Sequence, residues 1–282
     1  MSGLEVGVST HVLRGFCLEK HPGLFARHGM DLMELSSREF AYFTSDADFR
    51  ELRKALQDAR IRVNSIHVPF YGPPPATGPL DISHPDAAVR ARAIEVATIC
   101  AERLAELDGR CIVIHPSTEP VTEDRRTRLG LARGSLLELK SRIPCDAGVR
   151  IAVENLPRSN LGRVSSEIVG LVRELDDPMF GICLDVNHAN LEEDLLDATR
   201  ACAPYVITTH VCDNDGQGER HWLPGRGVIA WKEWIATMVR CGYTGPFVYE
   251  TGSLGDCDEQ TLAEIARNIK ELFRDAGAPP NE

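Results

Sequence analysis

The chain has 282 residues, of which 43% are hydrophobic and 26% are charged. This composition is that of an ordinary globular protein, and it excludes a disordered chain or one embedded in a membrane. The 42 acidic residues outnumber the 31 Lys and Arg and give a formal charge of −11. Proteins that neutralise phosphates usually carry a basic excess, so no nucleic-acid partner is expected.

In chain order, short apolar runs rich in β-branched residues alternate with longer segments of helical periodicity. The predicted strands are Leu4–Thr10, Asp31–Ser36, Arg62–Val68, Cys111–Ser117, Arg150–Leu156, Gly181–Val186, Val206–Asp213 and Phe247–Thr251. The predicted helices occupy residues 19–28, 46–60, 86–107, 123–141, 165–176, 192–202, 231–241 and 258–275. Each strand is followed by a helix, which is typical of a parallel sheet. Eight such units without a long linker predict an α/β fold, a (β/α)8 TIM barrel that forms a single domain over residues 1–282.

The boundaries of these elements carry recognisable signals. Ser45 or Asp46 is expected to cap the second helix and Ser165 the fifth, and glycines follow four helical runs, at Gly29, Gly109, Gly148 and Gly242. Two loops are rich in helix and strand breakers, Tyr71–Pro79 after the third strand and Asp213–Gly227 after the seventh. Both are expected at the C-terminal face of the barrel, where barrel enzymes build their active sites.

The beginning of the chain shows no basic segment followed by an apolar core, and no apolar stretch approaches the roughly 18 residues that a membrane span requires. We therefore expect a cytoplasmic protein with no membrane partner. The nine cysteines include no C-x-x-C pair. This pattern predicts buried, reduced thiols rather than disulfides or a thiolate zinc site.

The ends of the predicted strands concentrate ionisable residues. Side chains alternate along a strand, so the last inward residue of each barrel strand points into the mouth. Strands three to eight each end in such a residue, namely His67, His115, Glu154, Asp185, His210 and Glu250. The inward positions below them are expected to be Ser65, Cys111, Val113, Ala152, Cys183, Val206, Thr208 and Val248.

Carboxylates and imidazoles that converge on one small cavity would leave buried charge uncompensated without a cation. The cluster therefore predicts one bound divalent metal ion. Imidazole and carboxylate donors without a thiolate favour Zn²⁺ or Mn²⁺, with Co²⁺, Fe²⁺ and Mg²⁺ as alternatives, over the all-oxygen sites of Ca²⁺.

Further candidates surround this cluster. Glu34 points inward from the second strand, as a structural ion pair or as a substrate contact. Gly225 and Gly227 are expected to form a plain loop turn, although their N–H groups could also reach a substrate. Other residues near the mouth are His188, Asp213, Glu219, His221 and Arg226, with Phe16, Phe70, Tyr71 and Trp222 as apolar walls.

Four motifs resemble the xylose isomerase-like barrel superfamily: VEN ending at Asn155, LDVNH ending at His188, THVCDND from Thr209, and VYE ending at Glu250. That superfamily includes sugar and sugar-phosphate isomerases and epimerases, and the endonuclease IV type of nuclease, AP endonuclease family 2. For the epimerases, the resemblance implies that Glu154, Asp185, His210 and Glu250 hold one divalent ion. It also implies that the two glutamates form the acid/base pair and that His188 contacts the substrate.

The nuclease branch implies a zinc cluster that also uses His67, His115, His188 and a D-R-H triplet. That triplet reads Glu219-Arg220-His221 here, so its carboxylate is one methylene longer. A second ion bound by His67, His115, His188, Glu219 and His221 therefore stays an alternative.

The leading hypothesis is a metal-dependent isomerase or epimerase of a sugar, sugar phosphate or cyclitol-like carbonyl compound. Its two glutamates would transfer a proton through an enediolate, and the substrate contacts are expected at His67, His115, His188, Glu34 and Arg226. The alternatives are a zinc phosphodiesterase, another metal-dependent lyase or dehydratase, and a non-catalytic binding barrel. The sequence does not specify whether the chain forms a homo-oligomer.

Overall fold

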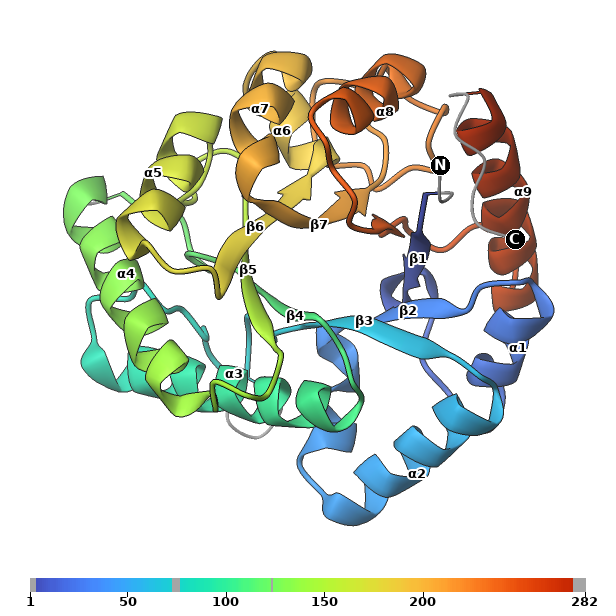
Figure 1. The fold of residues 1–282 in the computed structure, drawn as a ribbon, viewed down its shortest axis with the longest axis horizontal. Helices are drawn as coiled ribbons and strands as arrows, with labels where there is room; N and C mark the ends of the chain where they lie inside the picture. The colour runs from blue at the N-terminus through green and yellow to red at the C-terminus, as the bar shows by residue number, and fades with distance from the viewer. Residues whose placement is uncertain (1–3, 73–76, 123, 276–282) are drawn as a thin grey trace.

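The computed structural model describes residues 4–72, 77–122 and 124–275. Its eight parallel strands follow the chain order and close into a barrel, as Figure 1 shows. The strands are β1 (Val6–Ser9), β2 (Leu32–Leu35), β3 (Arg62–His67), β4 (Cys111–Ile114), β5 (Arg150–Glu154), β6 (Phe180–Asp185), β7 (Val206–Val211) and β8 (Phe247–Tyr249). The predicted TIM barrel is therefore confirmed.

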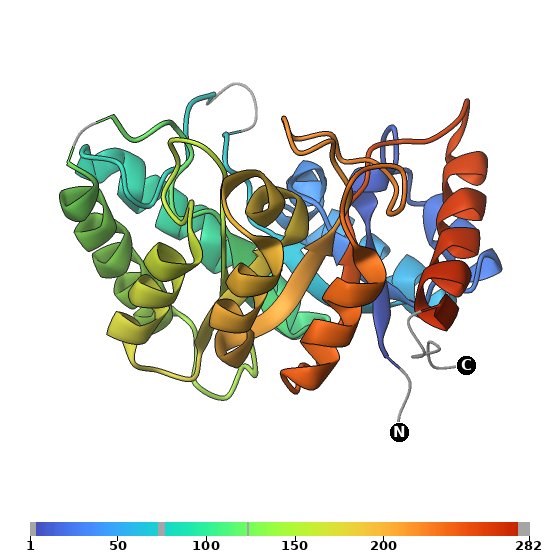
Figure 2. The same cartoon turned by 90° about the horizontal axis from the view of Figure 1, so that it is seen from above.

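The helices surround the barrel on its outside (Figures 1 and 2). They are α1 (His21–Arg27), α2 (Asp46–Asp58), α3 (Ala87–Glu106), α4 (Arg125–Arg142), α5 (Ser165–Leu175), α6 (Val186–Glu192), α7 (Leu195–Cys202), α8 (Trp231–Arg240) and α9 (Asp258–Asp275). Short 3-10 segments lie at η1 (Thr10–Val12), η2 (Ser37–Phe43) and η3 (Ala203–Tyr205). None of the helices in the described ranges is long and apolar enough to cross a bilayer.

The sixth unit differs from the prediction of one helix over residues 192–202. Asp185 ends β6 and caps α6 at once, because its carboxylate accepts a hydrogen bond from His188 N at 2.8 Å. The chain then breaks at Glu193, whose backbone is extended, and Asp194 caps α7 by accepting from Leu196 N and Asp197 N. Two successive aspartate caps thus start two short helices.

The caps confirm one prediction and correct another. Ser45 is the N-cap of α2 and accepts a hydrogen bond from Asp48 N. Ser165 is not a cap, because it is already the first residue of α5 and Val164 holds the cap position. The carboxylate of Glu193, from the following βα unit, accepts hydrogen bonds from both the backbone N and the hydroxyl of Ser165. A tertiary contact therefore replaces the local cap.

Small side chains fill the interior of the barrel. Cys111, Val113, Ala152 and Cys183 form a separate buried cluster, as the alternation predicted. The expected inward position of Val206 is wrong, because Val206 packs in the outer core and Ile207 lies against the inner cluster. The pairing of β6 with β7 shifts register at this point, from Ile182↔Val206 to Cys183↔Thr208, which moves one extra residue into the strand.

The cysteines are unpaired in the structure, but only some of them are core residues. Five are buried, whereas Cys17, Cys145, Cys241 and Cys257 are exposed. The expectation of uniformly buried thiols is thus corrected. Of the predicted loop Tyr71–Pro79, residues 73–76 lie outside the described residues, and residue 123 of the predicted fourth helix does too.

Candidate active site

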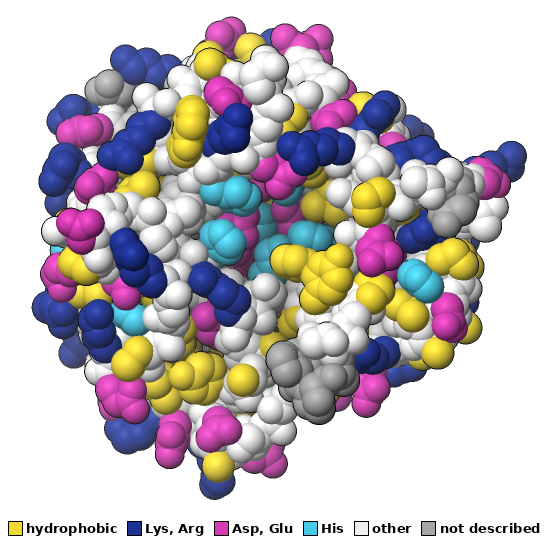
Figure 3. Space-filling view, turned by 180° about the vertical axis from the view of Figure 1, so that it is seen from behind, with side chains coloured by type: hydrophobic (Ala, Val, Ile, Leu, Met, Phe, Trp, Pro, Cys, Tyr) yellow, Lys and Arg dark blue, Asp and Glu magenta, His cyan; other side chains and the backbone are white. Residues whose placement is uncertain are grey.

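A cavity of about 360 Å³ opens at the C-terminal end of the barrel. Figure 3 shows this hollow, in which histidine and acidic side chains gather, with hydrophobic side chains along part of its rim. The described residues that line it are His11, Ser36, Ser37, Arg38, His67, Phe70, Tyr71, His115, Thr118, Glu154, Leu156, Pro157, Asn160, His188, Glu219, His221 and Glu250. The predicted mouth of the barrel is therefore the place where the ionisable residues meet.

The floor of the cavity is built by neighbouring strand ends. Glu154 ends β5, Asp185 ends β6, His210 lies near the end of β7, and Glu250 follows β8 directly. Each of these buried residues offers one donor atom, and the four donor atoms lie within 4.8 Å of one another. Parallel strands that end at one rim bring these residues together although up to 96 positions separate them in the chain, from Glu154 to Glu250.

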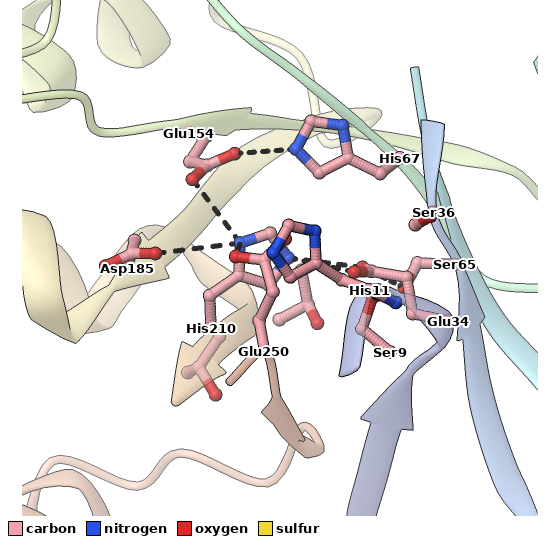
Figure 4. Close-up of polar contacts among 12 residues, drawn as sticks. Ser9, His11, Glu34, Ser36, Ser65, His67, Glu154, Asp185, His210 and Glu250 are labelled. Atoms are coloured by element: carbon pink, nitrogen blue, oxygen red, sulfur yellow. Dashed lines mark hydrogen bonds and ion pairs between the residues drawn. The ribbon is translucent and has the colours of Figure 1, made fainter. Parts of the chain in front are cut away.

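His210 stands at the centre of this group (Figure 4). Its Nδ1 lies 3.3 Å from Glu154 Oε1, 3.2 Å from Glu250 Oε2 and 3.9 Å from Asp185 Oδ2. On the opposite edge of the ring, His210 Nε2 lies 3.2 Å from the carboxylate of Glu34. Carboxylates on both sides therefore fix the orientation of this imidazole.

The expectation that Glu34 contacts the substrate is corrected. Its side chain is fully buried and does not line the cavity, because it lies one layer below the mouth, in the middle of β2. It accepts a hydrogen bond from Ser65 Oγ at 2.7 Å and faces His210. Glu34 is thus the partner that orients His210 from below, an arrangement common behind metal-binding histidines.

Three more histidines surround Glu154. His67 Nε2 and His115 Nε2 both lie 3.2 Å from Glu154 Oε2, and His188 Nδ1 lies 3.4 Å from Glu154 Oε1. Burial lowers the pKa of His67, but the hydrogen bond to Glu154 and the negative charges of Glu154, Glu250 and Glu34 together raise it to about 9. His115 has its pKa lowered, because burial dominates there.

The pKa values of the two floor glutamates shift in opposite directions. Burial alone would raise the pKa of Glu154, but His210 and His115 hold it well below its usual range. Burial raises the pKa of Glu250, and the nearby negative charge of Glu154 adds to that rise. The pKa of one carboxylate is thus lowered and that of the other is raised, a difference that suits an acid/base pair.

A second group lies above the floor and combines His188 of α6 with two residues of the loop after β7. Donor atoms of His188, Glu219 and His221 come within 4.8 Å of one another. His188 Nε2 lies 3.8 Å from Glu219 Oε2, and His221 Nδ1 lies 3.0 Å from the backbone O of Glu250. The predicted candidates Glu219 and His221 therefore do converge on the cavity.

Asp213 holds that loop in place rather than facing the cavity. Its buried carboxylate accepts hydrogen bonds from Gly225 N at 2.8 Å, Gly227 N at 3.0 Å and Trp231 Nε1 at 2.8 Å. These glycine N–H groups are consequently not donors to a substrate, and the plain turn is the better description. A Cβ at Gly227 would lie 2.1 Å from Asn214 O, so only glycine fits.

Other predicted contacts lie elsewhere. Arg226 does not line the cavity, and its guanidinium pairs with Glu264 of α9 at 2.6 Å. Phe70 and Tyr71 line the cavity, whereas Phe16 and Trp222 do not. Further lining residues, which were not predicted, follow the first, second, fourth and fifth strands: His11, Ser36, Ser37, Arg38, Thr118, Leu156, Pro157 and Asn160. Loop residues carry no periodic signal that would have identified them.

The floor has the chemistry of a cation site. Within the described ranges, the ion pairs of Glu154, Asp185 and Glu250 all run to histidines. The buried Oδ2 of Asp185 has no hydrogen-bond partner there. A buried carboxylate oxygen without a hydrogen bond, beside two other carboxylates and an imidazole, fits a divalent ion, which would compensate the buried charge.

Two known proteins are similar to this chain in sequence over most of its length. The chain is 27% identical to a D-psicose 3-epimerase from Ruminiclostridium cellulolyticum over 266 residues, which cover 90% of this chain and 86% of that one. It is also 27% identical to an L-ribulose 3-epimerase from Mesorhizobium japonicum, with 86% and 78% covered.

The fold is shared with the crystal structure of a D-tagatose 3-epimerase-like protein, with a TM-score of 0.81, 23% identity, and 97% and 98% of the two chains covered. The family model described as xylose isomerase-like TIM barrel matches residues 23–275. The chain therefore belongs to the xylose isomerase-like TIM barrel family.

Proposed function

We propose that this protein is a metal-dependent epimerase of a small ketose or related polyhydroxylated ketone, with inversion at the carbon next to the carbonyl. The observation that carries the proposal is the pair of Glu154 and Glu250, whose carboxylates both lie within 3.3 Å of one nitrogen of His210 in the cavity floor. The 3-epimerase names of the relatives support the same class of reaction.

The two glutamates would carry the proton. One carboxylate accepts the proton from the carbon next to the carbonyl, and the electron pair of the broken C–H bond moves into an enediolate. The other glutamate then donates a proton to the opposite face of the same carbon, which inverts its configuration. Because its pKa is raised and that of Glu154 is lowered, Glu250 suits the donor role in one direction of the reaction.

Glu154, Asp185, His210 and Glu250 would hold the divalent ion, for the reasons of charge and donor type given above. When bound, the ion would act as a Lewis acid that makes the proton next to the carbonyl more acidic. His188 and His67, which line the cavity beside Glu154, would orient the hydroxyl groups of the substrate.

A direct test of the function is deuterium exchange. The metal-loaded protein should incorporate deuterium from D₂O at C3 of ketoses such as D-psicose, D-tagatose and L-ribulose, and should form their C3 epimers. The exchange is followed by NMR, and a chelated sample serves as the control. If the loaded protein exchanged none of these ketoses, the epimerase proposal would fail.

A phosphodiesterase with a zinc cluster is the second candidate, because His188, Glu219 and His221 form another group of donors beside the floor. Metal stoichiometry separates the two. We expect one tightly held ion per chain, retained in His115→Ala, because His115 contacts Glu154 but is not in the four-residue floor group.

Elemental analysis after dialysis measures this stoichiometry. A His84→Ala variant is the matched control, since His84 does not line the cavity. Two or three tightly held zinc ions per chain, with one lost in His115→Ala, would instead favour hydrolysis, because imidazole would then be a primary ligand.

A further inference from the structure

The rim of the cavity carries a cationic group just after β2. Ser37 and Arg38 stand at the start of η2 and line the same cavity as Glu154 and Glu250. Among the described residues that line the cavity, Arg38 is the only Lys or Arg. The described part of the cavity thus has an acidic floor and a single guanidinium at its rim.

The charge of Arg38 is held in place but not neutralised. Its Nη2 donates hydrogen bonds to the backbone O of Thr10 at 3.1 Å and of His11 at 2.6 Å. An arginine carries five N–H donors, and those on Nε and Nη1 have no partner within the described chain. Arg220 and Arg226, in the loop after β7, differ, since they pair with Asp215 and Glu264. No carboxylate in the described ranges forms such a pair with Arg38.

The segment that carries Arg38 is anchored by a buried network. The carboxylate of Glu39 accepts hydrogen bonds from Thr10 Oγ1 at 2.7 Å and Ser36 Oγ at 2.5 Å. Ser36 N donates to Thr10 Oγ1 at 2.9 Å. These bonds tie the start of η2 to the end of β1, so Arg38 and Ser37 are presented from a fixed backbone.

We propose that Arg38 and Ser37 form a subsite for an anionic substituent of the substrate, a phosphate ester or a carboxylate at the end remote from the reacting carbon. This inference rests on the proposed epimerase function, because it places the reacting carbon between Glu154 and Glu250. Guanidinium groups bind both kinds of anion through charge-assisted hydrogen bonds. The cavity of about 360 Å³ is near the lower end of ligand pockets and suits one sugar with one substituent.

The test compares three substrates with one carbon skeleton: D-psicose, its 6-phosphate and the matching 6-carboxylate. The wild-type protein should show a higher kcat/KM for one or both anionic compounds. In Arg38→Ala the ratio of kcat/KM between the anionic compound and D-psicose should fall by roughly 10- to 100-fold, mainly through a higher KM. A loss of this size is typical when a hydrogen bond to a charged group is removed. Turnover of D-psicose should change little. The anionic compound whose kcat/KM falls more in Arg38→Ala identifies the substituent that the subsite binds.

Arg53→Ala is the matched control, because it removes the same charge at a distant place. Arg53 lines a separate cavity with Leu32 and Arg62, at the other end of the barrel. Turnover of D-psicose with no anionic advantage, or an equal loss for all three substrates in Arg38→Ala, would overturn the subsite and leave the epimerase proposal intact.

If none of the three compounds were turned over, the epimerase proposal would be in question, and calorimetric titration with the same compounds would decide the subsite. Binding of an anionic compound that Arg38→Ala weakens and Arg53→Ala does not would support the subsite. Equal binding of neutral and anionic compounds, or equal binding by wild type and Arg38→Ala, would refute it.

Discussion

Replacing Glu250 by Gln should lower turnover of the best ketose substrate by at least roughly 10²-fold, because the amide keeps a ligating oxygen and nearly the same volume but cannot exchange a proton. Burial and the charge of Glu154 raise the pKa of Glu250, as suits a proton donor. The substitution would therefore remove one of the two groups that transfer the proton. Steady-state kinetics with measured metal content tests this, and substrate binding should persist.

The control is Glu5→Gln, which removes a carboxylate that pairs with Arg62 and Arg110 outside the cavity. Its turnover should stay near that of the wild type. A metal-loaded Glu250→Gln protein with near-normal turnover would show that Glu250 is only a ligand, and the mechanism with two glutamates would have to be abandoned.

Glu154→Gln and His210→Ala should each lower metal affinity by about 10-fold or more and abolish turnover, while the barrel stays folded. His210→Ala removes one of the four floor donors, and Glu154→Gln removes the negative charge of another. The packed layers beneath the site, including Cys111, Val113 and Ala152, remain intact. Competition with a metal-sensitive dye measures the affinity, and circular dichroism with thermal unfolding follows the fold.

The matched control for His210→Ala is His21→Ala. His21 is also buried, but it pairs with Asp258 at 3.1 Å and does not line the cavity. Its loss should affect stability without changing metal affinity. If Glu154→Gln and His210→Ala both kept full metal occupancy in the presence of a competing chelator, the proposed ligand set would be wrong.

The sequence alone predicted the barrel and the ionisable residues at its strand ends. The eight repeats of an apolar strand and a periodic helix are local patterns. They predict a closed parallel sheet without any information from the loops. The two-residue period of a strand placed Glu154, Asp185 and His210 on its inner side, and the structure brings their donor atoms within 4.8 Å of one another. These features depend on backbone geometry that each segment carries within itself.

The roles of several residues were decided by the tertiary structure. Val206 and Ile207 exchange places because the pairing of β6 with β7 shifts register, which no single strand encodes. Glu34 lies beneath His210 rather than in the cavity, since its depth is set by the level of β2 in the barrel. Asp213 accepts hydrogen bonds from the N–H groups of Gly225 and Gly227 only when the loop folds back on itself. Arg38 is held at the rim by hydrogen bonds to the carbonyl groups of Thr10 and His11, which lie 28 and 27 positions away in the chain. Such contacts between segments exist only once the barrel has closed.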